Sequence, residues 1–442
     1  MKLVYLINPN KKVLSIVPHF LKDVYLKTKF YFLPENKILR NIIIFIYIKI
    51  LRKFLILWEL LFKVKINWRN PKKYKYIIFD DDSLEVINKV IPQDEYFVIT
   101  TRVPKLKEIY FSKEIVIYIL KNLFNNSLKI NYISCLIKLI KPEKIITWID
   151  NSIEFHYIHK LFNKSNIAFY ALQNAIRNEI YYKEIFSIGN YSGSYFCFGD
   201  YEINAIKKNS FISPQLNLRA IGSLKTELAK EFIQKENKDQ LGQIHDICFV
   251  SEAGAEIGTS GSLTKLQYEE DQKVAACIFR YTQFFCKKFK KKLLFLGRHD
   301  LRNKKDDYNK EVEYLFYKYQ NDVDDFKLQF FDKSKYENIK NLLQSKVIIG
   351  QASTLLRESF GLKKKVLICE GEIKEAEHDF STIDVPGGGI MKLKLGNYTD
   401  FEKRLLEILN MNYDEYLLKT KDAKLVYNLD FKTLEFLREE FK

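Results

Sequence analysis

Residues 346–361, KVIIGQASTLLRESFG, place hydroxyl and carboxylate side chains where a short apolar strand turns into a helix. Ser353 is a suitable N-cap for that helix, and Glu358 lies four residues after Thr354 on the same face. Free backbone N–H groups and the macrodipole favour an anion, most often a phosphate, at such a helix start. We expect Gln351, Ser353 and Thr354 to contact the phosphates of a nucleotide-sugar, and Glu358 to accept hydrogen bonds from its ribose. A capped helix after a strand also occurs in α/β proteins of other function, so this pattern leaves a purely structural role open.

Further polar side chains follow the apolar strands of the C-terminal half, at the strand ends where open α/β sheets bind ligands. They are Ser251 and Glu252 after ICFV, the loop GTSGS at Gly258–Ser262, and Arg298, His299 and Asp300 after LLFLG. We expect His299 or Arg298 to neutralise a phosphate or to contact a sugar carboxylate, with His299 as a catalytic candidate. A loop histidine that makes ordinary hydrogen bonds is the alternative.

In the N-terminal half, polar residues follow two strands within the sequences WIDNS and ALQNAIRNE. A carboxylate at a strand end that faces an acceptor hydroxyl suits a general base, and Asp150 is our candidate for that role in an inverting transfer. Burial or helix capping explains a single Asp equally well. The candidates for contact with the acceptor are Asn151, Gln173, Asn174 and Arg177.

Metal and redox chemistry have little support in the sequence. Asp80, Asp81 and Asp82 follow the strand YIIF and could coordinate Mg²⁺, but a solvated strand-end loop is the preferred interpretation, because Mg²⁺ is usually held by one or two carboxylates and substrate phosphates. The six cysteines form no CxxC pair and lie mostly in apolar runs. We expect no metal site, no obligatory cofactor and a reducing, cytoplasmic compartment.

The scaffold that positions these residues is predicted from alternating strands and helices, which indicate parallel βαβ units. Strands are expected at Leu3–Ile7, Tyr76–Phe79, Tyr96–Thr100, Lys144–Trp148, Ile167–Ala171, Tyr195–Cys197, Asp246–Val250, Lys292–Leu296, Lys327–Phe331, Lys346–Ile349 and Lys365–Cys369. The expected helices include Ser83–Val90, Lys310–Tyr319 and Asp414–Lys421. The fold class is therefore α/β, with two Rossmann-like domains that face each other across a cleft. We assign residues 1–229 to an acceptor domain, residues 244–425 to a donor domain, and residues 426–442 to a C-terminal helix that packs back on the first domain. The polar tract Lys230–Gln243 is expected to be the linker.

Charge points to a membrane surface as a partner. The net charge is +17, and residues 37–75 contain eleven Lys or Arg against the single acid Glu59. Within this basic amphipathic segment, the stretch NIIIFIYIKILRKFLILWELLF (residues 41–62) is intensely apolar, but charged residues interrupt it. A spanning helix is therefore not expected, and a helix that lies in the membrane interface is. A helix buried between domains is the alternative. Nucleic acid is not an expected partner, because no zinc finger, RNP motif or KH pattern occurs in a suitable context.

Several motifs carry a resemblance to a known family. GQASTLLRESFG resembles the D-S-T-x-x-x-E-A signature of bacterial surface-carbohydrate (capsule or O-antigen) biosynthesis proteins, and WIDNS, YALQNAIRNE and RAIGS resemble first-domain motifs of that group. Those proteins are similar to GT-B glycosyltransferases and, more distantly, to transferases that use CMP-activated sugars and to CDP-alditol phosphotransferases. The chain departs from the family at Gln351, where Asp is common, and at Ala175, where Gly is common. The resemblance implies an enzyme at the cytoplasmic face of the inner membrane, with the donor nucleotide in the second domain, the acceptor in the first, and no obligatory metal.

The combined expectation is a GT-B-like glycosyltransferase that adds a sugar from a nucleotide donor to a lipid-linked or polysaccharide acceptor. A CDP-alditol phosphotransferase or a nucleotide-sugar 2-epimerase would use the same fold. A non-catalytic assembly protein at the membrane would retain the basic segment without nucleotide affinity.

Overall fold

The computed structural model describes eleven stretches of the chain: residues 64–101, 107–122, 124–177, 179–188, 191–208, 213–235, 242–251, 265–297, 337–351, 353–371 and 386–442. Several sequence expectations lie outside these residues. They are the strand Leu3–Ile7, residues 37–63 of the basic amphipathic segment, Glu252, the loop Gly258–Ser262, Arg298, His299, Asp300, the helix Lys310–Tyr319 and the strand Lys327–Phe331.

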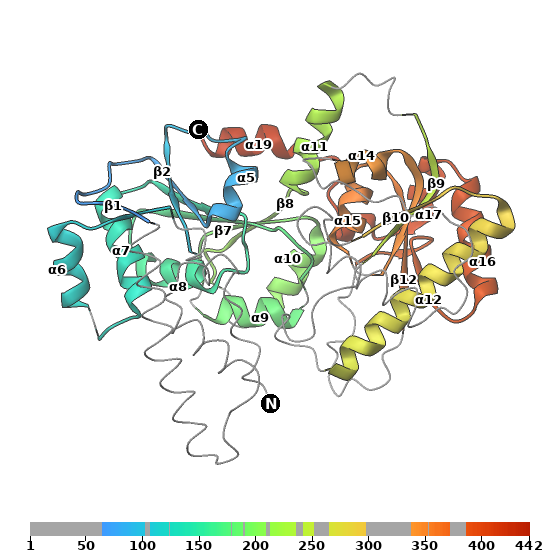
Figure 1. Cartoon of the computed structure of the whole chain (residues 1–442), viewed down its shortest axis with the longest axis horizontal. Coiled ribbons are helices and arrows are strands. Elements are labelled where there is room, and N and C mark those ends of the chain that lie inside the picture. Colours follow the sequence, from blue (N-terminus) through green and yellow to red (C-terminus); the bar gives the residue numbers. More distant parts are fainter. Residues whose placement is uncertain are drawn as a thin grey trace, which may run out of the picture. The chain divides into compact units, whose positions relative to one another are not determined.

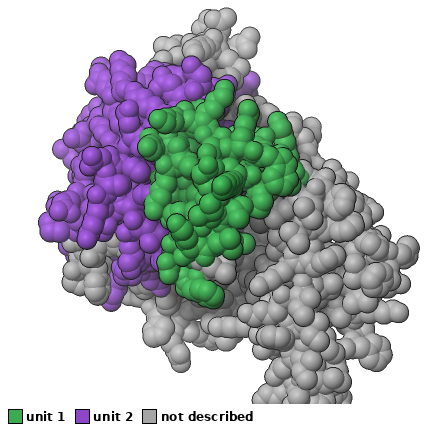
Figure 2. Space-filling view, turned by 90° about the vertical axis from the view of Figure 1, so that its left-hand side faces the viewer, with its two compact units in different colours: residues 1–74, 99–141 green, residues 75–98, 142–442 purple. Residues whose placement is uncertain are grey.

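The chain divides into two compact units, which Figure 2 colours separately. Unit 1 comprises Met1–Tyr74 and Ile99–Lys141, and unit 2 comprises Lys75–Val98 and Pro142–Lys442. The described part of unit 1 contains the parallel strand pair β1 (Lys65–Asn67) and β4 (Glu108–Tyr110), and the helices α6 (Lys113–Lys121) and α7 (Leu128–Ile140). Both larger sheets belong to unit 2, apart from the last residue of one edge strand.

The first large sheet has six strands in the order β3-β2-β5-β6-β7-β8, and the pairs from β2 to β8 are parallel. Its strands are β2 (Tyr76–Phe79), β3 (Tyr96–Ile99), β5 (Lys144–Thr147), β6 (Ala168–Leu172), β7 (Ser194–Cys197) and β8 (Asn217–Ala220). All four residues of β2 are buried, as expected for a parallel strand that is covered on both faces. Its connections include η2 (Asp81–Ser83), α5 (Leu84–Ile87), α8 (Ile153–Phe162), α9 (Glu179–Ser187), α10 (Asp200–Lys207) and α11 (Leu224–Lys235).

Helices cover both faces of this sheet (Figure 1). On one face, apolar residues of α5, α11 and α19 (Thr433–Glu440) form a core with Ile78, Ile146 and Phe196. On the other face, Phe155 of α8 packs edge-on against Phe79 of β2 at a centroid distance of 5.5 Å. Alternate residues of the strands therefore supply the two cores, because successive side chains point to opposite faces.

The second large sheet is entirely parallel, with the order β10-β9-β11-β12-β14. Its strands are β9 (His245–Val250), β10 (Leu293–Leu296), β11 (Ser345–Gly350), β12 (Lys365–Glu370) and β14 (Lys392–Lys394). The associated helices are α12 (Lys265–Phe289), α14 (Glu337–Leu343), α15 (Thr354–Gly361), α16 (Tyr398–Asn410), α17 (Tyr413–Lys419) and α18 (Ala423–Val426). Two further short strands of the C-terminal part of the chain, β13 (Gly388–Gly389) and β15 (Thr420–Lys421), form a separate antiparallel pair. The predicted α/β class with two Rossmann-like sheets is confirmed.

Three local predictions were wrong. The linker was expected from Lys230, but α11 continues to Lys235, because its Leu224, Leu228 and Ala229 are buried and hold the otherwise polar segment as a helix. The helix expected to end at Lys421 ends at Lys419, and the next two residues form β15. The helix expected from Ser83 to Val90 is a single 3₁₀ turn followed by the short α5. The three-part division of the chain stays a prediction.

No helix of the described residues is both long enough and apolar enough to cross a membrane.

Candidate functional site

The start of helix α15 has the capped geometry that the sequence predicts. Ser353 has extended backbone dihedrals, and its Oγ accepts a hydrogen bond from the backbone N–H of Leu355 at 3.4 Å. Gly350 ends the preceding strand β11, and a Cβ at that position would lie 3.0 Å from the carbonyl oxygen of Val250. A glycine is therefore favoured by close packing of neighbouring strand ends. The turn delivers Thr354 to the first position of the helix.

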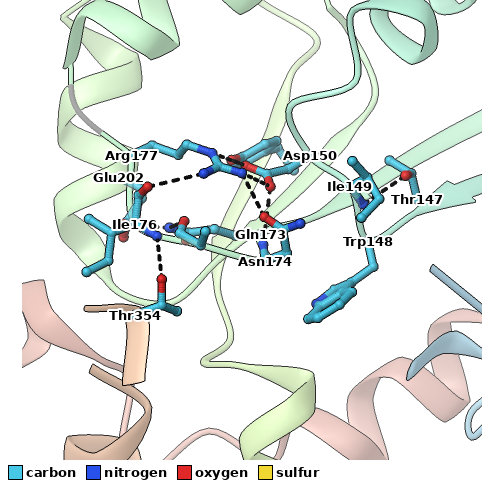
Figure 3. A network of polar contacts seen from close by, with 12 residues as sticks. Thr147, Trp148, Ile149, Asp150, Gln173, Asn174, Ile176, Arg177, Glu202 and Thr354 are labelled. Atoms are coloured by element: carbon cyan, nitrogen blue, oxygen red, sulfur yellow. Dashed lines mark hydrogen bonds and ion pairs between the residues drawn. The ribbon is translucent and has the colours of Figure 1, made fainter. Parts of the chain in front are cut away.

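Thr354 connects this helix start to the first sheet. Its Oγ1 accepts a hydrogen bond of 3.2 Å from the backbone N–H of Ile176, in the loop after β6. The same contact is drawn in Figure 3. The loop that follows a strand of the first sheet thus reaches the helix that follows β11 of the second. Because ligands of open α/β sheets bind beyond the carboxyl ends of the strands, this is the position where a ligand would meet both sheets.

Glu358 lies one turn deeper in α15 and has polar partners. It is buried, and its Oε1 accepts a hydrogen bond of 3.2 Å from the Ser223 hydroxyl. Its Oε2 lies 3.8 Å from Nζ of Lys225, whose side chain is partly exposed. The negative charge of the Glu358 carboxylate is therefore stabilised by the Ser223 hydroxyl and the Lys225 ammonium at the start of α11, and the carboxylate does not point into an apolar core.

Arg357, the neighbour of Glu358, forms a fully buried ion pair with Glu202 of α10. Its Nη2 lies 3.0 Å from Glu202 Oε2, and its Nη1 donates to Oε1. The guanidinium also donates from Nε to the Val426 carbonyl at 2.9 Å and from Nη2 to the same oxygen at 2.6 Å. Neither side chain is exposed to solvent. Burial lowers the pKa of Arg357, but the attraction of Glu202 outweighs it and the net shift is upward, so the guanidinium stays charged.

Gln173, predicted to contact the acceptor, belongs to this buried network. Its Nε2 donates to Glu202 Oε1 at 3.1 Å and to the Ala175 carbonyl at 2.9 Å, while its Oε1 accepts from the backbone N–H of Phe198 at 2.8 Å. These bonds use both donors of the amide and leave the side chain 2% exposed. The geometry favours a positioning role for Gln173 over direct contact with a substrate.

Asp150 and Arg177 form a second ion pair at the carboxyl end of the first sheet (Figure 3). Arg177 donates from Nε to Asp150 Oδ2 at 3.2 Å and from Nη2 to Oδ1 at 3.0 Å, which is a bidentate arrangement. Its Nη2 also donates to Asn174 Oδ1 at 2.7 Å. Burial lowers the pKa of Arg177, but the neighbouring carboxylate raises it by more, so this cation is permanent. The guanidinium lies 4.9 Å from the ring centroid of Tyr181, and the Arg177 side chain is 14% exposed.

The environment of Asp150 does not suit the general base that the sequence suggested. Besides Arg177, its carboxylate accepts from the backbone N–H of Asn174 at 3.2 Å and from the Tyr195 hydroxyl at 2.8 Å, and the side chain has no exposed surface. A base must reach the proton that it removes, and these four hydrogen bonds direct both oxygens toward the protein. The arrangement instead fixes the orientation of Arg177. Asn151, the next residue, is exposed in the turn before α8.

The side chain of Tyr427 packs between the motif RAIGS and helix α15. The hydroxyl of Tyr427 accepts a hydrogen bond from the Ser223 backbone N–H at 2.7 Å. Its ring lies where a Cβ on Gly222 or Gly361 would be, at 2.8 Å and 2.5 Å respectively, and Gly222 has a φ of +82°. Both glycines are therefore required by the close approach of one aromatic ring.

The remaining candidates are only partly described. Ser251 is buried at the end of β9, and its backbone N–H donates to the Leu296 carbonyl at 2.9 Å. Gln351 is buried after β11. Glu252, Arg298 and His299 lie outside the described residues, so their predicted roles stay predictions.

Within the described residues, Asp80, Asp81 and Asp82 form an acidic group at the end of β2. One carboxylate oxygen from each lies within 4.8 Å of the others, and Asp80 Oδ1 accepts from the Asp82 backbone N–H at 3.2 Å. Asp80 caps the 3₁₀ turn, which explains its presence without a metal.

Sequence reasoning missed Glu202, Arg357, Tyr195 and Ser223. One signal was available: Arg357 is a charged residue directly after Leu356 and three residues before Phe360, on what proves to be the buried face of α15. A charge on an apolar helix face indicates a buried partner. The identity of that partner depends on the tertiary structure.

Comparison with known proteins adds a fold-level likeness. No family model and no curated protein matches the chain. Similar solved structures include UDP-GlcNAc 2-epimerase from Methanocaldococcus jannaschii, with 11% identity over 84% of this chain and 100% of that chain and a TM-score of 0.46. A glycosyltransferase from Rickettsia africae has 14% identity over 84% and 93% with a TM-score of 0.40, and a wall teichoic acid polymerase has 10% identity over 83% and 88% with a TM-score of 0.44. At TM-scores below 0.5, these likenesses assign no activity to the chain.

Proposed function

We propose that the protein is a GT-B-like glycosyltransferase that takes a sugar from a nucleotide donor, with CMP-linked sugars among the candidates, to build a bacterial surface polysaccharide or glycolipid. One observation carries the proposal: the loop after β6 of the first sheet meets the capped start of α15 in the second sheet, through the 3.2 Å contact between Ile176 and Thr354. A ligand at this point has a helix N-terminus on one side and the Asp150–Arg177 pair of the first sheet on the other. Fold alone would not select this chemistry.

On the donor side, the N–H groups and hydroxyls of Ser353 and Thr354 hold the phosphate, because the helix start offers free donors and a positive dipole end. Glu358 accepts hydrogen bonds from the ribose with its Oε2 atom, whose partner among the described residues is Lys225 at 3.8 Å. We propose that Gln351, Ser251, Glu252, Arg298 and His299 complete this side of the site, with His299 or Arg298 stabilising the leaving phosphate.

On the acceptor side, Arg177 stabilises the negative charge that develops in the reaction, and Asp150 and Asn174 fix the orientation of its side chain. A cation whose side chain is fixed before the reaction stabilises developing negative charge without reorganisation. Asn151 and Asn174 supply further polar contacts. We propose that the acceptor is lipid-linked or a polysaccharide, that the reaction needs no metal, and that the enzyme works at the cytoplasmic face of the inner membrane.

Thermal-shift measurements with CMP, CDP, UDP and GDP test the donor site. A nucleotide at 100 times its dissociation constant adds about 2.7 kcal/mol of stability. Glu358→Gln is expected to weaken the binding of the responding nucleotide at least tenfold, whereas the exposed Glu439→Gln on α19 serves as a matched control and leaves it unchanged. The absence of a shift with all four nucleotides would refute the proposal.

Product analysis then separates the enzyme classes. A glycosyltransferase transfers the sugar only when an acceptor is supplied, whereas a 2-epimerase converts its nucleotide-sugar alone. A CDP-alditol phosphotransferase transfers an alditol phosphate in place of a sugar. Transfer that persists in EDTA supports metal independence, and transfer that stops in EDTA and returns with Mg²⁺ contradicts it and directs attention to Asp80–Asp82.

A further inference from the structure

Unit 1 carries an unusual concentration of exposed apolar side chains. Eleven large hydrophobic residues are exposed in the described residues, and six of them belong to this small unit: Trp68, Phe111, Ile117, Leu120, Phe124 and Leu128. Trp68 is 72% exposed and Phe124 is 97% exposed. Single exposed apolar residues are normal on a protein surface, but a group of them on one small unit marks an interaction site.

Helix α6 places three of the six in one row. Ile117, Leu120 and Phe124 follow the three- and four-residue spacing that places side chains on one helix face, with Phe124 just beyond the helix end. Ile115 on the opposite face is fully buried, which fixes the orientation of the helix. Phe111 precedes the helix and packs edge-on against Trp68 at a centroid distance of 5.4 Å.

The charges around this row are predominantly positive. The described residues of unit 1 contain ten Lys or Arg, all exposed, against the two carboxylates Glu108 and Glu114. Lys113 and Lys121 lie on the same exposed stripe of α6 as the apolar row, and Lys129 follows Leu128 at the start of α7. An apolar row bordered by cations complements a surface that is apolar inside and anionic outside, which describes a bilayer of anionic lipids.

We propose that this surface of unit 1, formed by the six apolar residues and the flanking lysines, is a membrane-docking site for anionic lipid. Trp68 would lie at the headgroup level, where the amphipathic indole is favoured, and the α6 row would enter the acyl boundary. This site is distinct from residues 37–63 and does not depend on the proposed sugar transfer, because lipid binding is measured without a donor.

Co-sedimentation of the full chain with vesicles tests the electrostatic part. The wild-type chain is expected to bind vesicles of phosphatidylcholine with phosphatidylglycerol, and to bind pure phosphatidylcholine weakly. Each lysine near an anionic leaflet contributes about fivefold to partitioning, so the triple variant Lys113→Gln/Lys121→Gln/Lys129→Gln should partition roughly 100-fold less. Partitioning equal to that of the wild type overturns the proposal.

A charge-matched control excludes a simple effect of net charge. The triple variant Lys208→Gln/Lys288→Gln/Lys432→Gln removes three exposed cations from unit 2 and should retain the binding of the wild-type chain. An equal loss in this variant would show that binding follows total charge and would refute a specific surface.

The apolar part has its own variants. Leu120→Ser/Phe124→Ser is expected to lower partitioning by at least tenfold, because each side chain loses most of its apolar transfer into the interface. Leu418→Ser removes a leucine of unit 2 that is 86% exposed, against 64% for Leu120, and should have no effect. A loss that is equal in both variants contradicts the proposal.

A spectroscopic reporter keeps the test independent of folding defects. The chain has three tryptophans, so Trp58→Phe/Trp148→Phe leaves Trp68 as the sole fluorophore. Its emission should shift to the blue and be quenched by brominated lipid only in anionic vesicles. An unchanged emission overturns the proposal, as does sedimentation velocity showing that the α6 substitutions abolish a dimer and leave vesicle binding intact.

Discussion

Replacement of Arg357 by Met is expected to lower the free energy of unfolding by about 3–5 kcal/mol, because it leaves the Glu202 carboxylate buried without its charge partner. Neither side chain has solvent-exposed surface, so water cannot take the place of the lost guanidinium. After the change, the partners that Glu202 retains among the described residues are the amide of Gln173 at 3.1 Å and the backbone N–H of Gly199 at 3.3 Å. The carbonyl of Val426 also loses its donors.

Urea unfolding of three variants measures this pair. Arg357→Met is compared with Glu202→Leu and with the double variant, whose cost should be well below the sum of the two single costs, because an apolar pair leaves no uncompensated charge. Arg438→Met is the matched control: its ion pair with Glu231, at 3.0 Å, is partly exposed and contributes at most about 1 kcal/mol.

Two results would refute this reasoning. If Arg357→Met costs no more than Arg438→Met, burial does not set the strength of the pair. If the double variant loses the full sum of the single variants, the two residues act independently and the ion pair is not the source of the stability.

The remaining predictions concern packing and pH. Gly361→Ala places a Cβ 2.5 Å from the Tyr427 ring and should destabilise the protein by about 1–3 kcal/mol in urea unfolding, whereas Gly242→Ala, with no atom within 4 Å, should be neutral; equal effects would contradict the close packing. Burial lowers the pKa of His156 to about 4 and that of His159 to about 4, so between the unfolded value near 6.5 and 4 the unfolded chain binds protons that the folded chain excludes. Stability should therefore fall as pH falls, by about 2 kcal/mol between pH 6 and pH 5 for the two histidines together, and His156→Gln should roughly halve that slope. A flat dependence between pH 6 and pH 5 would show that these rings accept protons in the folded state.

Most strands could be predicted because parallel strands covered on both faces are continuous apolar runs. YIIF at Tyr76–Phe79 and KVIIG at the end of β11 are recognisable without a structure. The C-terminal part of helix α11 was missed because LKTELAKEFIQK is highly polar, whereas its buried Leu224, Leu228 and Ala229 hold it against the core. Tertiary packing outweighed the local polarity that suggested a linker.

The positions of polar residues after parallel strands predicted which residues meet, but not which hydrogen bonds they form. Asp150, Asn174 and Arg177 do meet at one sheet edge, as parallel strands require. Their hydrogen-bond pattern was not predictable, since a carboxylate at a strand end looks the same in sequence whether it faces a substrate or an arginine. The Glu202–Arg357 pair joins residues 155 positions apart, and no local pattern encodes such a contact.

Helix α19 has a consequence for how the polypeptide is made. Its residues Leu434 and Leu437 belong to the same apolar core as Tyr76 and Ile78 of β2. The Tyr76 hydroxyl also donates a hydrogen bond to the carbonyl of Phe441, which lies 365 positions later in the sequence. A ribosome that adds about 5–20 residues per second needs roughly 20–70 s to supply that carbonyl after the tyrosine. During this interval the part of the apolar core that α19 covers, beside α5 and α11, stays exposed in the nascent protein. Chaperone dependence during synthesis, and aggregation when translation stops before α19, follow from this late closure.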